Sequence, residues 1–150
     1  MRIVIQRVTE ASVSIGGVVK SSVGKGMMIL VGVEHADTSD DVDWLVRKVL
    51  ALRIFNDENG VMNRSILDVK GEILVVSQFT LHASTRKGNR PSYIRAARPE
   101  QAIPLYRAFI DGLNRELPVP AGEGEFGADM QVSLINDGPV TIIIDSHLRE

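Results

Sequence analysis

The sequence predicts an α+β fold in which a barrel-like β-sheet is flanked by two helices. Runs of alternating and β-branched residues, separated by turn residues, fill the first third of the chain. Two later segments carry apolar residues at helical spacing, and further apolar runs follow each of them. The chain has 150 residues, 44% of them hydrophobic and 24% charged, without a linker-like change in composition. We therefore expect residues 1–150 to form one domain.

Most of the sheet is expected from the first third of the chain. Alternation and turn residues predict strands over 2–8, 11–15, 18–23, 27–33 and, further along, 72–77. Gly16-Gly17 is the two-residue turn of the first hairpin. The run 27–33 is nearly all apolar, which indicates a strand buried on both faces.

Two amphipathic helices are expected to cover the sheet. Thr38 or Ser39 caps the first helix, because a side-chain oxygen there satisfies free N–H groups of the first turn. Its buried stripe comprises Val42, Leu45, Val46, Val49 and Leu52. The second helix begins near Pro99 and ends at about Leu117, before Pro118. Its core face comprises Ala102, Ile103, Tyr106, Phe109, Ile110 and Leu113.

Two more strands are expected near the C-terminus, over 130–135 and 140–145. The segment Asn136-Asp137-Gly138-Pro139 between them is rich in turn formers. We therefore interpret it as a turn that pairs these two strands with each other.

The composition excludes several kinds of chemistry. Because the chain has no cysteine, it has no disulfide, thiolate–zinc site or cysteine nucleophile. The histidines His35, His82 and His147 lie far apart and form no paired-ligand motif, so we expect no metal and no cofactor. No signal-peptide core or membrane-spanning run is present, and a cytoplasmic protein without membrane contact is expected. The net charge of -2 means that any basic surface for RNA has to be local.

Two segments carry polar groups suited to chemistry. Ser77-Gln78-Phe79-Thr80-Leu81 stands at the end of an apolar strand, where such groups often line a site, although strand-end capping by Ser and Thr is a sufficient explanation. Turn chemistry alone explains Asn136-Asp137-Gly138-Pro139-Val140-Thr141. A Gly-Pro bond nevertheless adopts the cis form at modest cost, and a cis turn aims two carbonyl oxygens in one direction.

Together, these two segments resemble the paired signature of the D-aminoacyl-tRNA deacylases. The similarity extends over the whole chain, including the Met1 to Val8 start with its Arg7, the Phe55-Asn56-Asp57 segment and the overall length. A related subgroup, which acts on misacylated threonine tRNA, carries Ala where this chain has Phe79, so Phe79 favours the D-specific branch. The resemblance implies a deacylase fold and hydrolysis of the ester bond of D-aminoacyl-tRNA, and of glycyl-tRNA mischarged on alanine tRNA.

The resemblance also implies how L-residues are rejected. In the family the Gly-Pro bond is cis and enters the active site of the other subunit, so Gly138 and Pro139 are expected to form a cross-subunit chirality gate in a homodimer. Rigid backbone there excludes the side chain of an L-residue, whereas glycine has no side chain to exclude. Arg7 is expected to hold the gate, because a guanidinium donates to several carbonyls in fixed geometry. The alternative is a strand-face arginine in a surface ion pair.

Catalysis is assigned to Ser77, Gln78, Phe79 and Thr80. Thr80, or else Ser77, is the candidate nucleophile, but neither has an evident base, and His82 is expected to be a solvent-facing loop histidine. In the other mechanism, the 2′-hydroxyl of the tRNA assists, while backbone N–H groups of Phe79 and Thr80 orient the ester and stabilise the oxyanion.

A basic stretch beside this segment is the candidate tRNA site. Between residues 73 and 99 there is no Asp or Glu, and the stretch contains Arg86, Lys87, Arg90, Arg95 and Arg98. The loop with Arg86, Lys87 and Arg90 suits phosphate contact, although charged loops are normally just solvated. Met130 is expected to line the pocket of the terminal adenosine; the alternative is an ordinary core methionine.

Two other functions stay open. One is a deacylase of other misacylated tRNAs with little chiral selectivity. The other is a non-hydrolytic tRNA- or DNA-binding module that uses the same basic loop. Hydrolysis of D- against L-tyrosyl-tRNA tests the first, and nucleic-acid affinity without ester cleavage would indicate the second.

Overall fold

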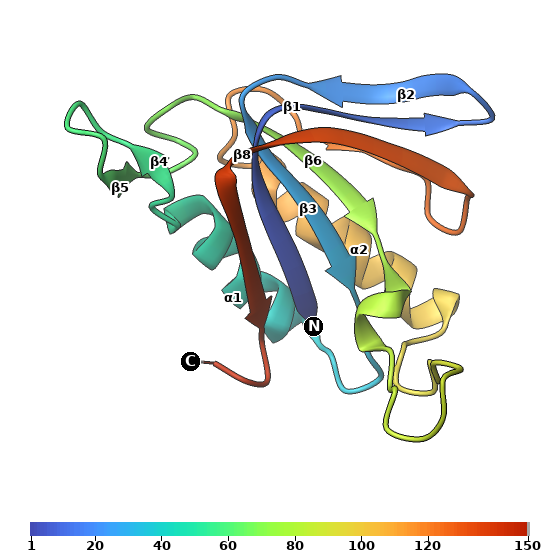
Figure 1. The fold of residues 1–150 in the computed structure, drawn as a ribbon. Coiled ribbons are helices and arrows are strands. Elements are labelled where there is room, and N and C mark those ends of the chain that lie inside the picture. Colours follow the sequence, from blue (N-terminus) through green and yellow to red (C-terminus); the bar gives the residue numbers. More distant parts are fainter. Residues whose placement is uncertain (150) are drawn as a thin grey trace.

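A curved, mixed β-sheet of six strands carries two helices on one of its faces (Figure 1). The structure is a computed structural model and describes residues 1–149. Its elements are β1 (Arg2–Ile15), β2 (Val18–Val23), β3 (Gly26–Gly32), α1 (Ser39–Ala51), β4 (Phe55–Asn56), β5 (Met62–Arg64), β6 (Glu72–Ser77), the 3-10 helix η1 (Phe79–His82), α2 (Pro99–Asn114), β7 (Gly122–Glu123) and β8 (Met130–Asp145). The predicted α+β class, with a barrel-like sheet and two helices, is confirmed.

Strand β1 pairs with three other strands and organises the sheet. Its first half pairs antiparallel with β3 and its second half with β2. Along nearly its whole length it also pairs antiparallel with β8, from Arg2 opposite Asp145 to Ile15 opposite Met130. Side chains alternate between the two faces of a strand, so Ile3 and Ile5 in the first half of β1 both lie in the core.

The parallel pairing of β3 with β6 brings two strand ends to the same edge of the sheet. The register runs from Gly26 opposite Glu72 to Val31 opposite Ser77. Gly26 allows the two backbones to approach, because a Cβ atom there would lie 1.8 Å from the Glu72 carbonyl oxygen. The fold thus places Ser77 at the carboxyl edge of a parallel pair, a frequent location for ligand sites.

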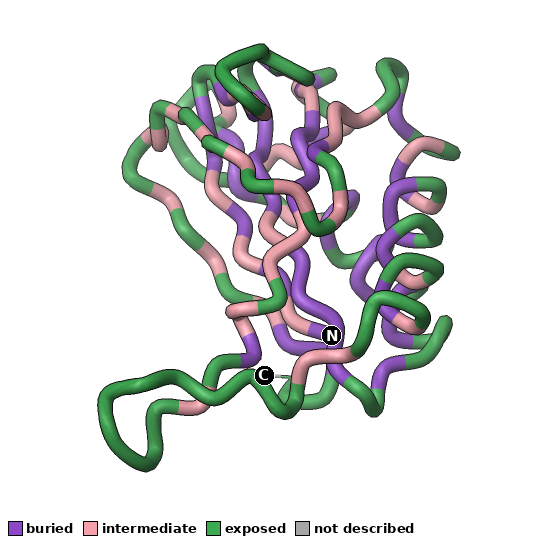
Figure 2. Tube along the Cα trace, turned by 90° about the vertical axis from the view of Figure 1, so that its right-hand side faces the viewer, coloured by how far each residue is buried: buried purple, intermediate pink, exposed green. Residues whose placement is uncertain are grey.

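Helices α1 and α2 cover one face of the sheet and pack against each other. Thr38 caps α1 as predicted, and its N–H donates to the Asp41 carboxylate over 2.9 Å. The helices approach closely at Gly112, where a Cβ atom would lie 2.8 Å from a methyl group of Val46. The main core lies between helices and sheet, and Figure 2 shows the buried residues on the strands and on the helix sides that face them. No helix within residues 1–149 is both long enough and apolar enough to cross a membrane.

The prediction of a hairpin near the C-terminus is wrong. Residues 130–145 form one continuous strand, β8, and both of its halves pair with β1 instead of with each other. Opposite the single residue Arg7, the segment 137–140 leaves the ladder as a bulge. Turn-forming residues suit this bulge as well as a hairpin turn, because both need backbone conformations outside the ladder.

Smaller differences between the predicted and the observed elements also have local causes. The first two predicted strands are one continuous strand, β1. Ile103 is 40% exposed and Leu52 is half-buried, so both lie at the margin of the stripes predicted to be buried. Helix α2 ends at Asn114, somewhat earlier than expected. Strands β4, β5 and β7 were not predicted, because strands of two or three residues leave no readable alternation.

We predict that Gly26→Ala lowers the free energy of unfolding by about 3 kcal/mol, because the added Cβ forces β3 and β6 apart. Chemical denaturation at a fixed protein concentration measures the change. Gly24→Ala is the matched control, since its Cβ would meet only a Glu72 carboxylate oxygen, at 4.0 Å. We expect the control to change stability by no more than about 0.5 kcal/mol. Equal stability of the two variants would contradict the close pairing of β3 with β6.

Candidate functional site

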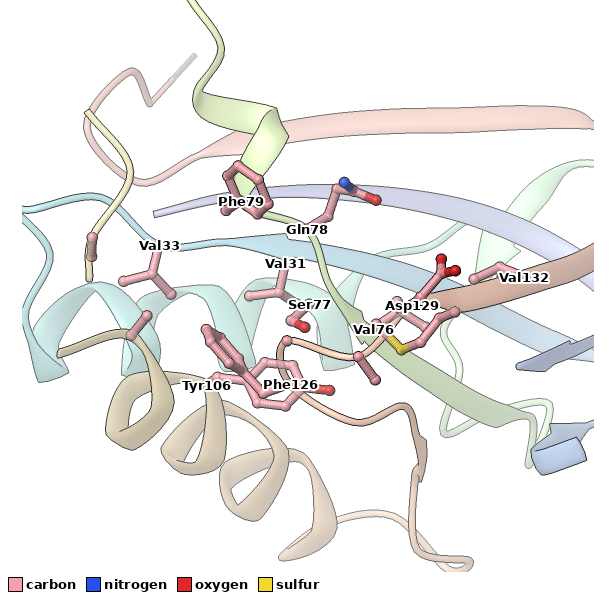
Figure 3. A pocket seen from close by; sticks show the side chains of 15 residues that line it. Val31, Val33, Val76, Ser77, Gln78, Phe79, Tyr106, Phe126, Asp129 and Val132 are labelled. Carbon is pink, nitrogen blue, oxygen red and sulfur yellow. The ribbon is translucent and has the colours of Figure 1, made fainter. Parts of the chain in front are cut away.

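A cavity of about 300 Å³ opens at the edge where β3 and β6 end (Figure 3). It is bounded by the two strand ends, by one side of α2 and by the segment that leads into β8. Residues that line it include Val31, Ser77, Gln78, Phe79, Tyr106 and Met130. Apolar walls with a few polar groups are typical of sites for small molecules or for one unit of a larger ligand.

The predicted Ser77–Thr80 segment forms one side of this cavity. Ser77, Gln78 and Phe79 line it directly. Thr80 follows in η1, and its hydroxyl oxygen accepts a hydrogen bond from the side-chain amide of Gln78. The four residues expected to carry the chemistry therefore lie together, and their individual roles remain predictions.

After β6 the backbone turns sharply into η1. The Gln78 N–H donates to β3 over 2.7 Å, and the Leu81 N–H donates to the Gln78 carbonyl over 3.3 Å. The N–H groups of Phe79 and Thr80 stand in the first turn of η1, where helix geometry provides no acceptor, and they donate to no group within residues 1–149. Two adjacent unpaired N–H groups at the edge of a cavity are suitable donors for an oxyanion.

Helix α2 contributes a buried tyrosine to the cavity wall. The Tyr106 hydroxyl donates to the Val75 carbonyl over 3.1 Å, and the side chain is almost fully buried. Burial raises the pKa of Tyr106, and the negative charge of Glu123 acts in the same direction. The phenol therefore stays protonated at neutral pH and cannot serve as a general base.

The start of β8 closes the cavity from the other side. Met130 lines it, and its sulfur accepts the Glu125 N–H over 3.4 Å; its expected contact with the terminal adenosine stays a prediction. Asp129 also lines the cavity and is exposed; it is the one acidic side chain in the lining formed by residues 1–149. Asp129 was not predicted, because a lone acidic residue in a loop forms no sequence pattern.

Arg7 occupies the gap left by the bulge of β8. The residue is 7% exposed, and its guanidinium donates to the carbonyls of Ile54, over 2.6 Å, and Asp137, over 3.1 Å. Its Nε also lies 3.2 Å from a carboxylate oxygen of Asp137. Arg7 is thus a buried side chain with several acceptors, unlike the surface arginine of the alternative interpretation.

Residues on both sides of the bulge fix its shape. The side chain of Asn136 accepts the Val140 N–H over 2.9 Å and donates to the Thr141 hydroxyl over 3.0 Å. Gly138 has a φ of 128°, and a Cβ atom there would lie 2.9 Å from a Val140 methyl group, so this position requires glycine. The Gly138–Pro139 peptide bond is cis, and both residues are exposed.

One chain does not bring its two signature segments together. Ser77, Gln78, Phe79 and Met130 share the cavity, whereas the Gly138–Pro139 bulge and Arg7 are absent from its lining. Arg7 holds the bulge through the Asp137 carbonyl, and Gly138 and Pro139 are exposed. Contact between the bulge and a cavity of this kind would require a second copy of the chain.

The basic stretch forms a closed loop after η1. Ser84 and Ser92 exchange two backbone hydrogen bonds, 2.8 and 2.9 Å long, and thereby fix the two ends of the loop beside each other. Arg86, Lys87 and Arg90 are exposed on this loop. None of the three has an acidic partner within 4.0 Å in the part of the chain that the structure describes.

Arg95, in contrast, is engaged in an ion pair. Its guanidinium donates to the buried carboxylate of Glu34 over 2.8 Å. Burial raises the pKa of the Glu34 carboxyl, but the hydrogen bond from Arg95 and the positive charge of Arg95 outweigh this effect. The pKa of Glu34 therefore lies below its ordinary value, and Glu34 is ionised at neutral pH.

The expectation that His82 faces solvent is wrong. His82 is 2% exposed, because η1 turns the chain inward and places the ring against Gly32, where a Cβ atom would lie 3.0 Å away. Its Nδ1 lies 3.9 Å from a Glu34 carboxylate oxygen. Neither ring nitrogen has a hydrogen-bond partner within residues 1–149, and His82 does not line the cavity.

One group of side chains has the spacing of metal ligands. Potential ligand atoms of Glu34, Asp37 and His147 lie within 4.8 Å of one another. The Asp37 carboxylate, however, already accepts hydrogen bonds from the amino group of Met1 and, over 2.7 Å, from the Glu34 N–H. It also lies 2.8 Å from Nε2 of His147. These groups form an ion-pair network that ties the two ends of the chain together, and we assign no metal to it.

Comparison with known proteins identifies the family of the chain. Residues 4–145 match the family model described as D-Tyr-tRNA(Tyr) deacylase. The D-aminoacyl-tRNA deacylase of Bacteroides thetaiotaomicron is 63% identical over 150 residues, which cover 100% of both chains. A solved structure of a protein named "c-Myc DNA Unwinding Element Binding Protein" is 44% identical, with a TM-score of 0.92 over 97% of this chain and 98% of that chain.

A second solved structure, of a probable eukaryotic D-amino acid tRNA deacylase, is more distant in sequence. It is 18% identical and has a TM-score of 0.82 over 95% of this chain and 97% of that chain, which supports the fold alone. The fold and the close relatives define the class: the protein is an enzyme, a hydrolase of the deacylase type. Within that class, the chain belongs to the D-Tyr-tRNA(Tyr) deacylase family.

We predict that Glu34→Gln destabilises the protein in a pH-dependent manner. A carboxyl whose pKa is lowered by folding adds stability above its ordinary pKa of 4.5 and loses this contribution as the pH falls through the lower, folded-state value. Arg95 is 58% exposed, so we expect a loss of only about 1 kcal/mol at pH 7. Thermal unfolding from pH 7 down to pH 3 measures it, with exposed Glu116→Gln as the control. A difference in stability between the unaltered protein and the Glu34→Gln variant that stays constant from pH 7 to pH 3 would contradict the prediction.

Proposed function

We propose that the protein hydrolyses the ester bond of D-aminoacyl-tRNA and releases free tRNA and the D-amino acid. The observation that carries the proposal is the edge of the cavity, where the Ser77–Thr80 segment presents two unpaired backbone N–H groups in a chain of this family. Close relatives of the same length bear the name D-aminoacyl-tRNA deacylase. We place this activity in the cytoplasm, where the enzyme proofreads aminoacyl-tRNA before translation.

In the proposed reaction the terminal nucleoside enters the cavity, with Met130 against the adenosine. The ester carbonyl lies at the N–H groups of Phe79 and Thr80, which stabilise the negative charge that develops on its oxygen. No histidine or lysine lines the cavity among the described residues, and Tyr106 is held protonated. The lining also holds a carboxylate, that of the exposed Asp129. In this proposal the vicinal 2′-hydroxyl of the tRNA, and not Asp129, assists the attacking water, while Ser77 and Gln78 orient the ester.

Selectivity is proposed to come from a second copy of the chain in a homodimer. The Gly138–Pro139 bulge of one protomer enters the cavity of its partner and places rigid backbone next to the α-carbon. Arg7 and Asn136 support this interpretation, because their hydrogen bonds hold the bulge in one position. An L-side chain would collide with this backbone, whereas a D-side chain points outward. Glycine has no side chain, so glycyl-tRNA, including that mischarged on alanine tRNA, is accepted.

The tRNA is proposed to follow the basic loop. Arg86, Lys87 and Arg90 are exposed, and the loop starts directly after η1. Cations in this place position the phosphates of the acceptor end without reading its sequence. The enzyme would then contact the tRNA phosphates and reject L-residues without recognising any particular side chain. One enzyme could therefore act on many D-aminoacyl-tRNAs.

The purified protein is expected to release D-tyrosine from D-tyrosyl-tRNA and to leave L-tyrosyl-tRNA intact. The physical reason is the exclusion of the L-side chain by the partner's backbone. Glycyl-tRNA is expected to be cleaved at the enzyme concentrations that clear D-tyrosyl-tRNA. Release of labelled amino acid over time measures all three reactions.

Other outcomes of the same assay would support other functions. Comparable cleavage of D- and L-tyrosyl-tRNA would indicate a deacylase of other misacylated tRNAs. Affinity for tRNA or DNA without cleavage would indicate a binding module. One solved relative bears the name of a DNA-unwinding-element-binding protein, and this makes the binding module the second candidate function.

Thr80→Ala is expected to lower kcat by no more than about tenfold, because the backbone N–H groups remain and only the hydroxyl that contacts Gln78 is lost. Thr80→Ser, which keeps the hydroxyl, is the matched control. Single-turnover hydrolysis of D-tyrosyl-tRNA measures both. A loss of about 10⁴-fold or more for Thr80→Ala, with intact folding and tRNA affinity, would identify Thr80 as the nucleophile instead.

A further inference from the structure

An exposed aromatic pair adjoins the cavity. Phe79 is 55% exposed, Tyr93 is 39% exposed, and the neighbouring Ile94 is 80% exposed. The rings of Phe79 and Tyr93 meet edge to face, with centroids 5.1 Å apart and an interplanar angle of 75°. We call Phe79, Tyr93 and Ile94 the aromatic platform. Large apolar side chains that are exposed next to one another often mark a binding surface.

Backbone contacts hold the platform in place. The Tyr93 carbonyl accepts the Ala96 N–H over 3.0 Å, so Tyr93 and Ile94 begin a turn. The next residues are fixed to the chain beyond β3, because the Ala97 N–H donates to Val33 over 2.9 Å and Arg95 forms its ion pair there. The rings are thus presented before any ligand arrives, which reduces the entropy lost on binding.

The surroundings of the platform are basic. Ser92, which closes the loop carrying Arg86, Lys87 and Arg90, directly precedes Tyr93. No acidic residue occurs between positions 73 and 99. Exposed rings beside free cations match single-stranded nucleic acid, whose bases stack on aromatic side chains while its phosphates contact cations. If the same surfaces of two protein copies faced each other, their basic loops would repel.

We propose that the aromatic platform binds an unpaired nucleobase that precedes the terminal adenosine of the tRNA. This inference rests on the proposed function, which places the terminal nucleoside in the cavity. Phe79 belongs to both surfaces, since it lines the cavity and contacts Tyr93. The RNA strand that leaves the cavity therefore passes over the platform before it reaches the basic loop. Stacking tolerates different bases, so this contact adds affinity without restricting the choice of tRNA.

Two D-tyrosyl esters, one of adenosine and one of the trinucleotide CCA, separate the platform from the cavity. Tyr93→Ala is expected to lower kcat/KM about 10- to 100-fold for the trinucleotide ester, which has bases for the platform. The same variant should leave the adenosine ester unaffected. Tyr93→Phe keeps the ring and both activities, whereas Tyr93→Leu keeps apolar surface without a ring and should behave as Tyr93→Ala does.

Val119→Ala is the matched control, because Val119 is 51% exposed and belongs to neither surface. An equal loss on both esters, or no loss on the trinucleotide ester, would overturn the proposal. Dissociation of a dimer by Tyr93→Ala would also overturn it, because the platform would then belong to the contact with the second copy.

Failure of the proposed function can be distinguished from failure of the platform. If the unaltered protein cleaves no D-tyrosyl ester, calorimetric binding of unacylated CCA still tests the stacking site. Weaker binding by Tyr93→Ala than by Tyr93→Phe would support the platform without any hydrolysis. Equal binding by the two variants would refute it.

Discussion

The buried guanidinium of Arg7 connects three parts of the chain that are distant in sequence. It lies on β1, donates to the carbonyls of Ile54 and Asp137, and lies 3.4 Å from the side-chain oxygen of Asn56. Burial of a cation is costly unless acceptors replace the lost water, so the backbone around Arg7 has to supply them. The position of the β8 bulge relative to β1 follows from this requirement. The proposed chiral selectivity therefore depends on it.

Each chain presents a cavity and a bulge on different strand pairs. The parallel pair β3–β6 ends at the cavity, and the antiparallel pair β1–β8 carries the bulge. Both pairs belong to one sheet, so their relative position is set by backbone hydrogen bonds and not by flexible loops. In a two-fold symmetric dimer, each bulge would meet the partner's cavity and both copies would be used equally.

Much of the fold and site could be predicted from local patterns. Alternation, the capping residue Thr38 and Pro99 at the start of α2 predicted the class, both helices and the strands β2, β3 and β6. The two longest strands, β1 and β8, were each predicted as two separate strands. The Ser77–Thr80 and Asn136–Thr141 segments carried the resemblance to the family that the comparisons confirm. Each segment alone has an ordinary explanation in strand-end capping or turn chemistry, and only the presence of both segments in one chain carried the resemblance.

The missed features depend on contacts that local patterns do not contain. Asn136 and its neighbours suit a hairpin turn, and only the pairing of both flanks with β1 distinguishes a bulge from a hairpin. His82 is buried because a 3-10 turn directs it inward, although a polar segment precedes it. The contact between Phe79 and Tyr93 joins two irregular segments, which no periodicity predicts.

The role of Arg7 is tested most directly by the ratio of D- to L-tyrosyl-tRNA hydrolysis in Arg7→Lys. Lysine keeps the positive charge but cannot donate to two separate carbonyls in the fixed geometry of a guanidinium. We predict that the ratio falls at least about tenfold, chiefly because L-tyrosyl-tRNA begins to be cleaved, while the variant stays folded. An unchanged ratio in a folded Arg7→Lys protein would contradict the control of chirality by the bulge that Arg7 holds.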